Sequence, residues 1–314
     1  MPTDPVPPES VPVGWPTTEV LESTLREITE TRARHPETIA ELAQTRTRRS
    51  SPLGETGKAL IVAADHPARG SLRAGADPLA MADRADLLMR LCVALARPGV
   101  TGVLGTADVL EDLLLLGALH DRSVFGSMNR GGLAGATFEL DDRFTGYDVR
   151  AITRFRFDGG KMLLRIDHED ERSAPTLAAC ADAVTALAEA HLVAMVEPFV
   201  SRRVDGRLQN DLSIPAATTA VAIASGLGNT SAYTWLKVPV IGDGGEDMAR
   251  VLATTTLPTL LLGGEVSADQ EATYERWSRA LRLPTVRGLV VGRSLLYPPD
   301  GDVVAAVDTA AGLL

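Results

Sequence analysis

Residues 233–264 read YTWLKVPVIGDGGEDMARVLATTTLPTLLLGG, and this stretch holds the unit from which most of the chain is built. An apolar run at 233–238 is followed by a glycine-rich turn, a helical pattern at 244–255 and a second apolar run at 259–263. Two strands joined through a helix form a right-handed crossover and lie parallel in one sheet. Strands that are apolar throughout indicate a sheet that is covered on both faces.

The same alternation runs from residue 58 to the C-terminus. Eight apolar runs are predicted to be strands: 59–64, 102–105, 123–127, 161–166, 192–197, 233–238, 259–263 and 286–291. Helical patterns are predicted between and after them: 77–97, 108–120, 148–154, 173–190, 212–226, 244–255, 268–281 and 301–313. Eight such units favour an α/β fold of one kind, a closed (β/α)8 TIM barrel. An open dinucleotide-binding sheet is disfavoured because no GxGxxG follows the first strand.

The first 55 residues have a different character. Residues 1–16 are rich in proline and are predicted to form an extended arm. Helical patterns begin at Thr17 and again after Pro36. We therefore predict a Pro-rich arm and helical extension over 1–55 and the barrel over 56–314. The extension either caps the bottom of the barrel or contacts another subunit.

Composition narrows the class of protein. The 314 residues carry a net charge of −10, and aromatic residues make up only 4% of them. Bulk charge and scarce aromatics both disfavour nucleic-acid binding, although a local cationic pocket stays possible. No apolar run reaches the ~18 residues of a membrane span, and the N-terminus lacks the pattern of a signal peptide. We expect a cytoplasmic protein, with Cys92 and Cys180 as buried thiols in a reducing compartment.

Polar residues stand where most of the predicted strands end. Since the carboxyl ends of barrel strands form the rim that carries active sites, these residues are expected to converge there. They are Asp65 and His66, 127–130, Lys161, Arg165 and Asp167, Glu197, Lys237, Gly263 and Gly264, and Gly292 and Arg293.

Lys237 is the sharpest of these signals, because it lies inside an apolar strand. Burial lowers the pKa of a lysine, and a partly neutral lysine attacks carbonyl groups to form a Schiff base. Asp65, Glu197 and Lys161 offer the proton-transfer partners that such chemistry needs. The alternative is an ion-pair network that fills the top of the barrel. His66 is a weaker candidate, since histidines at loop starts are more often structural.

Two glycine-containing strand ends suggest a phosphate site. Gly263 and Gly264 follow one strand, and Gly292 and Arg293 follow the next. Glycines expose backbone N–H groups, and an arginine adds a charge-assisted donor. The alternative is that the glycines only permit tight turns. The carboxylates at 141–142 and 167–171 could bind a divalent cation, but a solvated surface is favoured for them.

These motifs carry a resemblance to a known family. Trp-Leu-Lys237-Val-Pro, Leu262-Gly263-Gly264, Val291-Gly292-Arg293-Ser294, Ala64-Asp65-His66, Gly160-Lys161-Met162 and Val196-Glu197-Pro198 resemble motifs of class I, Schiff-base aldolases. The superfamily is that of the archaeal-type fructose-bisphosphate, tagatose-bisphosphate and deoxyribose-phosphate aldolases, and the resemblance covers roughly 58–314.

The resemblance implies a role for each matched residue. Lys237 would form the Schiff base, Glu197 and Lys161 would assist proton transfer, and Asp65 would bind the substrate or Lys237. The phosphate would be held by Gly263, Gly264, Gly292 and Arg293. No metal and no cofactor are implied, because the iminium serves as the electron sink. The expected protein is a lyase with a small phosphorylated sugar as substrate, no nucleic-acid or membrane partner, and a homo-oligomeric assembly.

Departures from the family bear on the substrate. The fourth strand reads Leu-Leu-Arg165-Ile-Asp167 where the bisphosphate aldolases carry tyrosines, and Glu265 stands where a small or basic residue is usual. The likeness is greatest to a subgroup associated with myo-inositol breakdown. That implies cleavage of 2-deoxy-5-keto-D-gluconate 6-phosphate to dihydroxyacetone phosphate and malonate semialdehyde, with Arg165 or Arg130 meeting the carboxylate. The alternatives are a deoxyribose-phosphate or fructose/tagatose-bisphosphate aldolase, and a non-catalytic barrel that binds a sugar phosphate.

Overall fold

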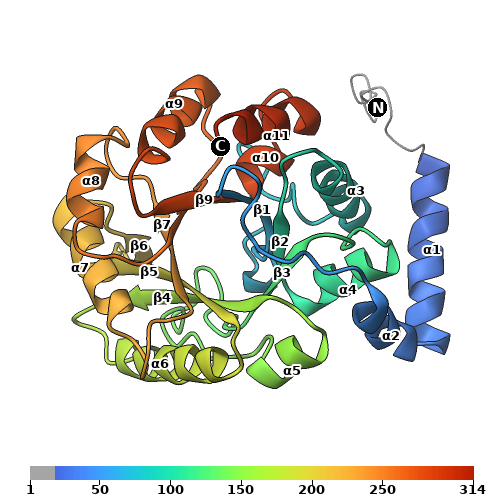
Figure 1. The fold of residues 1–314 in the computed structure, drawn as a ribbon, viewed down its shortest axis with the longest axis horizontal. Coiled ribbons are helices and arrows are strands. Elements are labelled where there is room, and N and C mark those ends of the chain that lie inside the picture. The colour runs from blue at the N-terminus through green and yellow to red at the C-terminus, as the bar shows by residue number, and fades with distance from the viewer. Residues whose placement is uncertain (1–17) are drawn as a thin grey trace, which may run out of the picture.

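The computed structural model describes residues 18–314, so the Pro-rich arm predicted at 1–16 lies outside the described residues. Eight parallel strands close into a barrel in the order β1, β2, β3, β4, β5, β7, β8 and β9, and β9 pairs back onto β1 (Figure 1). The strands are β1 Ala59–Ala64, β2 Gly102–Gly105, β3 Ser123–Ser127, β4 Gly159–Ile166, β5 Val193–Val204, β7 Thr234–Pro239, β8 Thr259–Leu262 and β9 Val286–Val291. The predicted (β/α)8 TIM barrel is confirmed.

One strand extends beyond the barrel. The prediction ended the fifth strand at 197, but β5 continues to Val204 and pairs antiparallel with β6 (Arg207–Asn210). Asp205 and Gly206 form the turn between them, with φ of 49° and 77°. An Asp-Gly pair with both φ angles positive is the usual chemistry of a two-residue hairpin. The hairpin stands at the rim of the barrel and was missed although its turn signal is present in the sequence.

Helices follow the strands and cover the barrel: α3 Arg84–Leu95, α4 Ala107–Leu115, α5 Val149–Arg154, α6 Ser173–Glu189, α7 Ile214–Ser225, α8 Glu246–Leu252, α9 Gln270–Ala280 and α11 Val303–Gly312. Two short helices, η1 Pro67–Arg69 and α10 Arg293–Leu296, were not predicted. The helix predicted at 77–97 begins only at Arg84, because the Asp83 side chain caps it by accepting from the Asp86 N–H. The helix predicted at 108–120 ends at Leu115, shortly before Gly117 takes a left-handed φ of 68°.

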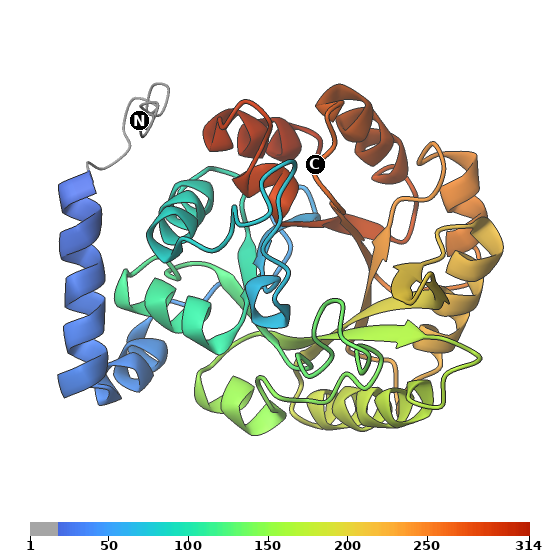
Figure 2. The ribbon, with the colours of Figure 1, turned by 180° about the vertical axis from the view of Figure 1, so that it is seen from behind.

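The N-terminal extension comprises α1 (Thr18–Arg34) and α2 (Glu37–Thr45), which lie along one flank of the barrel (Figures 1 and 2). Arg32 of α1 binds Glu111 and Asp112 of α4. Ile39 and Ala43 of α2 are buried in the core between the helices and the barrel. The expected helical extension is thus present, and it packs against the outer helices.

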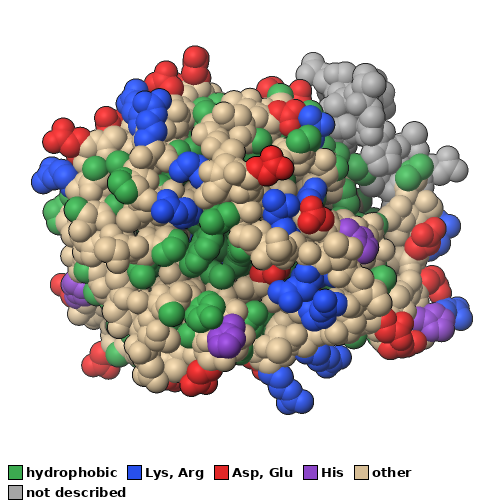
Figure 3. All heavy atoms as spheres, viewed as in Figure 1, with side chains coloured by type: hydrophobic (Ala, Val, Ile, Leu, Met, Phe, Trp, Pro, Cys, Tyr) green, Lys and Arg blue, Asp and Glu red, His purple; other side chains and the backbone are tan. Residues whose placement is uncertain are grey.

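Side chains alternate between the inside and the outside of the barrel. The inward residues form one apolar cluster: Ala59, Ile61, Ala63, Leu104, Phe125, Met195, Leu260 and Val290. Leu53, Val193 and Trp235 pack against it near the amino ends of the strands. Apolar side chains gather near the middle of the face shown in Figure 3. The barrel is therefore filled at its bottom, and space for a ligand is left at the carboxyl ends of the strands.

Two further predictions concern the thiols and the membrane. Cys180 is buried in α6, while Cys92 is partly buried in α3, and both are free thiols. None of the helices within residues 18–314 is both long enough and apolar enough to cross a bilayer.

Candidate active site

A cavity of about 380 Å³ opens at the carboxyl ends of the strands, on the side that faces the viewer in Figure 2. Every residue predicted for catalysis or phosphate binding lines it: Asp65, Lys161, Arg165, Glu197, Lys237, Gly263, Gly264, Gly292 and Arg293. His66 and Arg130 also line it. The volume falls in the range of small-molecule sites.

The two-residue period of the strands explains this convergence. Lys161 and Arg165 are four residues apart on β4, so both side chains point into the barrel, while Met162 and Leu164 pack in the outer core. On β5, Glu197 points inward, and the register that pairs Val196 with Leu236 sets Glu197 beside Lys237 of β7. Three neighbouring strands thereby deliver three ionisable groups to one point.

These groups form a continuous buried chain. The Lys237 Nζ donates to Glu197 Oε1 at 2.9 Å, and the other carboxylate oxygen of Glu197 binds Lys161. Lys161 Nζ also donates to Asp65 Oδ2 at 3.1 Å. Asp65 in turn pairs with Arg130, which donates through Nε to Ser127 Oγ at 2.7 Å. Asp65 and Lys161 are each 2% exposed, so their charges are held almost without water.

Burial and mutual charge set the protonation of this chain. Burial lowers the pKa of Lys237; Glu197 opposes that shift, whereas Arg130 and Arg293 add to it. Burial likewise holds the pKa of Lys161 well below its usual range. For Glu197, burial favours the neutral acid, but Lys161 and Lys237 outweigh burial and hold its pKa well below the usual range. The site therefore offers a carboxylate that stays ionised between two amines that lose protons readily.

His66 was ranked as a weaker candidate, but it faces the same cavity. Its Nδ1 is buried without a hydrogen bond to any described residue, and it lies 3.9 Å from Asp65 Oδ1. Burial, Arg293 and Lys237 lower the pKa of His66 well below its usual value, which favours the neutral ring. A neutral histidine can both accept and donate a proton at this position.

The glycine-rich ends of β8 and β9 lie against one another. A Cβ at Gly292 would stand 2.3 Å from the Ala63 carbonyl oxygen, and Gly264 has a left-handed φ of 69°. The Arg293 guanidinium donates to the carbonyls of Gly264 and Arg73, each at 3.4 Å. Arg293 forms no ion pair with any carboxylate of residues 18–314, so its charge is available to a ligand.

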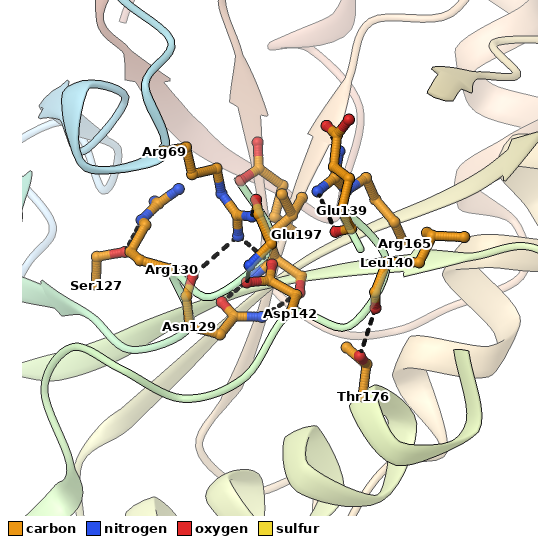
Figure 4. Close-up of polar contacts among 12 residues, drawn as sticks. Arg69, Ser127, Asn129, Arg130, Glu139, Leu140, Asp142, Arg165, Thr176 and Glu197 are labelled. Atoms are coloured by element: carbon orange, nitrogen blue, oxygen red, sulfur yellow. Dashed lines mark hydrogen bonds and ion pairs between the residues drawn. The ribbon is translucent and has the colours of Figure 1, made fainter. Parts of the chain in front are cut away.

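The segment between β3 and α5 folds over the opposite side of the cavity (Figure 4). Arg69 of η1 donates to the Asn129 carbonyl at 2.9 Å and pairs with Asp142. Arg165 pairs with the Glu139 carboxylate and donates to its carbonyl at 3.0 Å. Thr176 of α6 donates to the Leu140 carbonyl at 2.9 Å. The segment is thus fastened to the barrel by side chains from three elements.

Sequence reasoning missed Arg69 and Glu139, and it misjudged Asp142. The carboxylates at 141–142 were expected on a solvated surface, yet Asp142 is buried beside Arg69. The local sequence does not indicate that Asp142 is buried, because its partner Arg69 lies in a distant part of the chain. Asp170 pairs with Arg172, and within the described part of the chain no group of three or more His, Cys, Asp or Glu side chains could hold a metal ion.

The cavity is rich in basic side chains within an acidic protein. Its lining carries six Lys and Arg side chains (Arg69, Arg130, Lys161, Arg165, Lys237 and Arg293) and four Asp and Glu side chains (Asp65, Glu139, Glu197 and Glu265). The chain as a whole has a net charge of −10. Four of the six basic residues are arginines, whose guanidinium N–H groups suit an anionic ligand.

The chain belongs to the Cgl0159-like family, whose pattern matches residues 57–311. The crystal structure of Cgl0159 from Corynebacterium glutamicum is 54% identical, with a TM-score of 0.88, and the match covers 95% of this chain and 97% of that one. No curated protein matches this chain significantly.

More distant solved structures share the fold. A Schiff-base-forming fructose-1,6-bisphosphate aldolase is 15% identical, with a TM-score of 0.60, over 88% of this chain and 99% of its own. A fructose-bisphosphate aldolase from Slackia heliotrinireducens is also 15% identical, with a TM-score of 0.58, over 82% and 85% of the two chains. At these identities the likeness shows the (β/α)8 barrel fold and no more.

Proposed function

We propose that this protein is a class I aldolase that cleaves a phosphorylated keto sugar or sugar acid through a Schiff base on Lys237. The observation that carries the proposal is the position of Lys237. Its side chain is 4% exposed, its amine contacts the Glu197 carboxylate at 2.9 Å, and it lines the cavity that also holds the glycines and Arg293. A buried amine of lowered pKa beside a fixed carboxylate is the arrangement that carbonyl addition requires.

The reaction proceeds through covalent steps that this set of residues can serve. The neutral amine of Lys237 adds to the ketone carbon, and loss of water from the carbinolamine gives a protonated iminium. A base removes the proton of the substrate hydroxyl, and the C–C bond breaks as its electron pair moves to the iminium, which becomes an enamine. The aldehyde leaves, the enamine is protonated at carbon, and water releases the ketone and the free lysine.

Glu197 is suited to the proton transfers because it stays ionised next to the reacting nitrogen. The iminium keeps a positive charge where the ammonium was, so Glu197 retains its electrostatic partner after the Schiff base forms. Lys161 shares the same carboxylate and also contacts Asp65, which places both within reach of a substrate hydroxyl. Arg293 with Gly263, Gly264 and Gly292 would hold the phosphate.

The finer proposal for the substrate is 2-deoxy-5-keto-D-gluconate 6-phosphate, cleaved to dihydroxyacetone phosphate and malonate semialdehyde. The support is the sequence resemblance together with the cationic lining of the cavity. The carboxylate of the semialdehyde half would lie near Arg165 and Arg130. We expect Arg165→Met to slow turnover of the acid substrate, and unchanged turnover would count against that role.

Borohydride trapping tests the class of reaction. The protein is incubated with dihydroxyacetone phosphate, reduced and digested, and the peptide masses are measured. We expect a stable adduct on the peptide that holds Lys237 and none in Lys237→Met. Lys161→Met is the matched control, since it removes a buried amine of the same cluster and should leave an adduct on Lys237. An adduct only on Lys161 would overturn the assignment of the nucleophile.

If dihydroxyacetone phosphate gives no adduct, the trap is repeated with acetaldehyde, pyruvate and malonate semialdehyde. Silence with every carbonyl compound, together with clear binding of a sugar phosphate, would refute the aldolase and favour a non-catalytic barrel. Turnover is then compared on the keto-gluconate phosphate, deoxyribose 5-phosphate and fructose 1,6-bisphosphate. Cleavage of the latter two alone would overturn the finer proposal.

A further inference from the structure

The cavity has two arginine-bearing ends that face each other across the barrel. Arg165 lies on β4 and Arg293 follows β9, and in the closed strand order β4 and β9 are separated by three strands along either path. The two strands are therefore diametrically opposed. Lys237 on β7 stands between the two ends.

The two ends differ in their free charge. Arg293 donates only to two backbone carbonyls and forms no ion pair among the described residues. Glu265, the carboxylate that acts on it most strongly, is exposed and beyond ion-pair distance. Arg165, by contrast, is neutralised by Glu139, which holds it through both its carboxylate and its carbonyl. At the Arg165 end, Arg69 is likewise neutralised by Asp142.

The Glu139 side chain is held in the wall of the cavity by hydrogen bonds to its own segment. Its second carboxylate oxygen accepts from the Gly135 N–H at 2.9 Å, and the residue is 8% exposed. The adjacent Leu140 carbonyl is held by Thr176, and the Thr137 carbonyl is bound by Arg172 and Arg203. The carboxylate therefore stays in the cavity wall beside Arg165.

We infer that Glu139 is a specificity-determining residue that selects sugar monophosphates against bisphosphates by cancelling the charge of Arg165. A phosphate dianion at the Arg293 end meets a free guanidinium. A second dianion at the Arg165 end meets a buried carboxylate and no excess positive charge. The Arg165 Nε is buried without a hydrogen-bond partner among residues 18–314, so it can donate to a hydroxyl or a single carboxylate.

The inference rests on the proposed function only in taking sugar phosphates as the ligands. It is therefore tested with polyol phosphates, which have no carbonyl group and cannot form a Schiff base. Binding of a hexitol monophosphate and of hexitol 1,6-bisphosphate is measured by isothermal titration calorimetry on the wild-type chain, Glu139→Gln and Asp141→Asn. Asp141 is the matched control, because it is a carboxylate of the same segment whose partner, Arg143, is exposed.

We expect the wild-type protein to bind the monophosphate at least as tightly as the bisphosphate. Glu139→Gln should shift the ratio of the two dissociation constants toward the bisphosphate by roughly tenfold, the effect of one charge across a cavity of intermediate dielectric constant. Asp141→Asn should leave the ratio unchanged. The glutamine side chain can still accept a hydrogen bond from the Gly135 N–H, so we expect the variant to fold. Circular dichroism is used to check the fold of each variant.

Three results would overturn the inference. They are a wild-type protein that binds the bisphosphate more tightly than the monophosphate, an unchanged ratio in folded Glu139→Gln, and failure of both polyol phosphates to bind. Selective binding of the monophosphate without any borohydride adduct would support the role of Glu139 and refute only the aldolase. An adduct on Lys237 without selective binding would support the aldolase and refute only the role of Glu139.

Discussion

Replacing Glu197 by glutamine should destabilise the folded chain at neutral pH, because it leaves two buried amines without their shared carboxylate. Lys161 keeps Asp65 at 3.1 Å, but Lys237 forms no other ion pair within the described residues. Removing one partner of a buried ion pair typically costs about 3–5 kcal/mol. We expect a loss of that size in the free energy of unfolding at pH 7.

The loss should shrink as the pH rises. Without Glu197, the pKa of Lys237 in the folded chain falls further below its unfolded value, so the unfolded chain binds more protons between those two values. The free energy of unfolding then increases with pH up to about 10.4, the unfolded pKa of lysine. One proton corresponds to a slope of up to about 1.4 kcal/mol per pH unit. The slope is shallower in the wild-type protein, where Glu197 keeps Lys237 charged more of the time.

Urea unfolding at pH 7.0, 8.0 and 9.0, followed by circular dichroism, measures both quantities. Glu265→Gln is the matched control: it removes an exposed carboxylate from the same cavity and should change stability by less than about 0.5 kcal/mol. A Glu197→Gln chain that loses less than about 1 kcal/mol at pH 7, with the wild-type dependence on pH, would refute the reasoning.

Three further changes test other parts of the structure. Gly292→Ala should weaken the binding of inorganic phosphate about tenfold in calorimetry, because its Cβ would stand 2.3 Å from the Ala63 carbonyl; an unchanged dissociation constant would contradict this. Asp142→Ala should lower the urea-measured free energy of unfolding by about 3–5 kcal/mol, since it leaves the buried Arg69 charge unpaired, and a loss below about 1 kcal/mol would argue otherwise. Tyr147→Phe should leave that free energy within about 0.5 kcal/mol or raise it, because the buried hydroxyl has no hydrogen-bond partner among residues 18–314; a large loss would reveal a missing partner.

The barrel and its central lysine were predictable because short segments of the sequence are enough to indicate both. Apolar runs of four to eight residues separated by helical patterns indicate a parallel barrel, and a lysine within such a run stands out. The inward direction of Lys161 and Glu197 then follows from the two-residue period of strands. The start of α3 was misplaced because the helical pattern continued upstream of its cap at Asp83.

The residues that were missed depend on contacts between distant parts of the chain. Arg69 and Asp142 are 73 residues apart, and Glu139 and Arg165 meet only because the segment after β3 folds back over the rim. Unless the course of this segment is known, a carboxylate in a stretch rich in turn residues cannot be told from a carboxylate exposed to solvent. Charge pairing across a cavity therefore requires the three-dimensional structure, whereas strand order and inward-facing positions do not.

Arg46 links the N-terminal helices to the bottom of the barrel. It is 3% exposed, and its guanidinium donates to the carbonyls of Arg122 and Arg156 at 3.1 and 2.7 Å. Those carbonyls belong to the loops that enter β3 and β4, at the end of the barrel away from the cavity. If the helices detached, the carbonyls of Arg122 and Arg156 would lose the guanidinium that donates to them. We therefore expect the N-terminal helices and the barrel to unfold together as one cooperative unit.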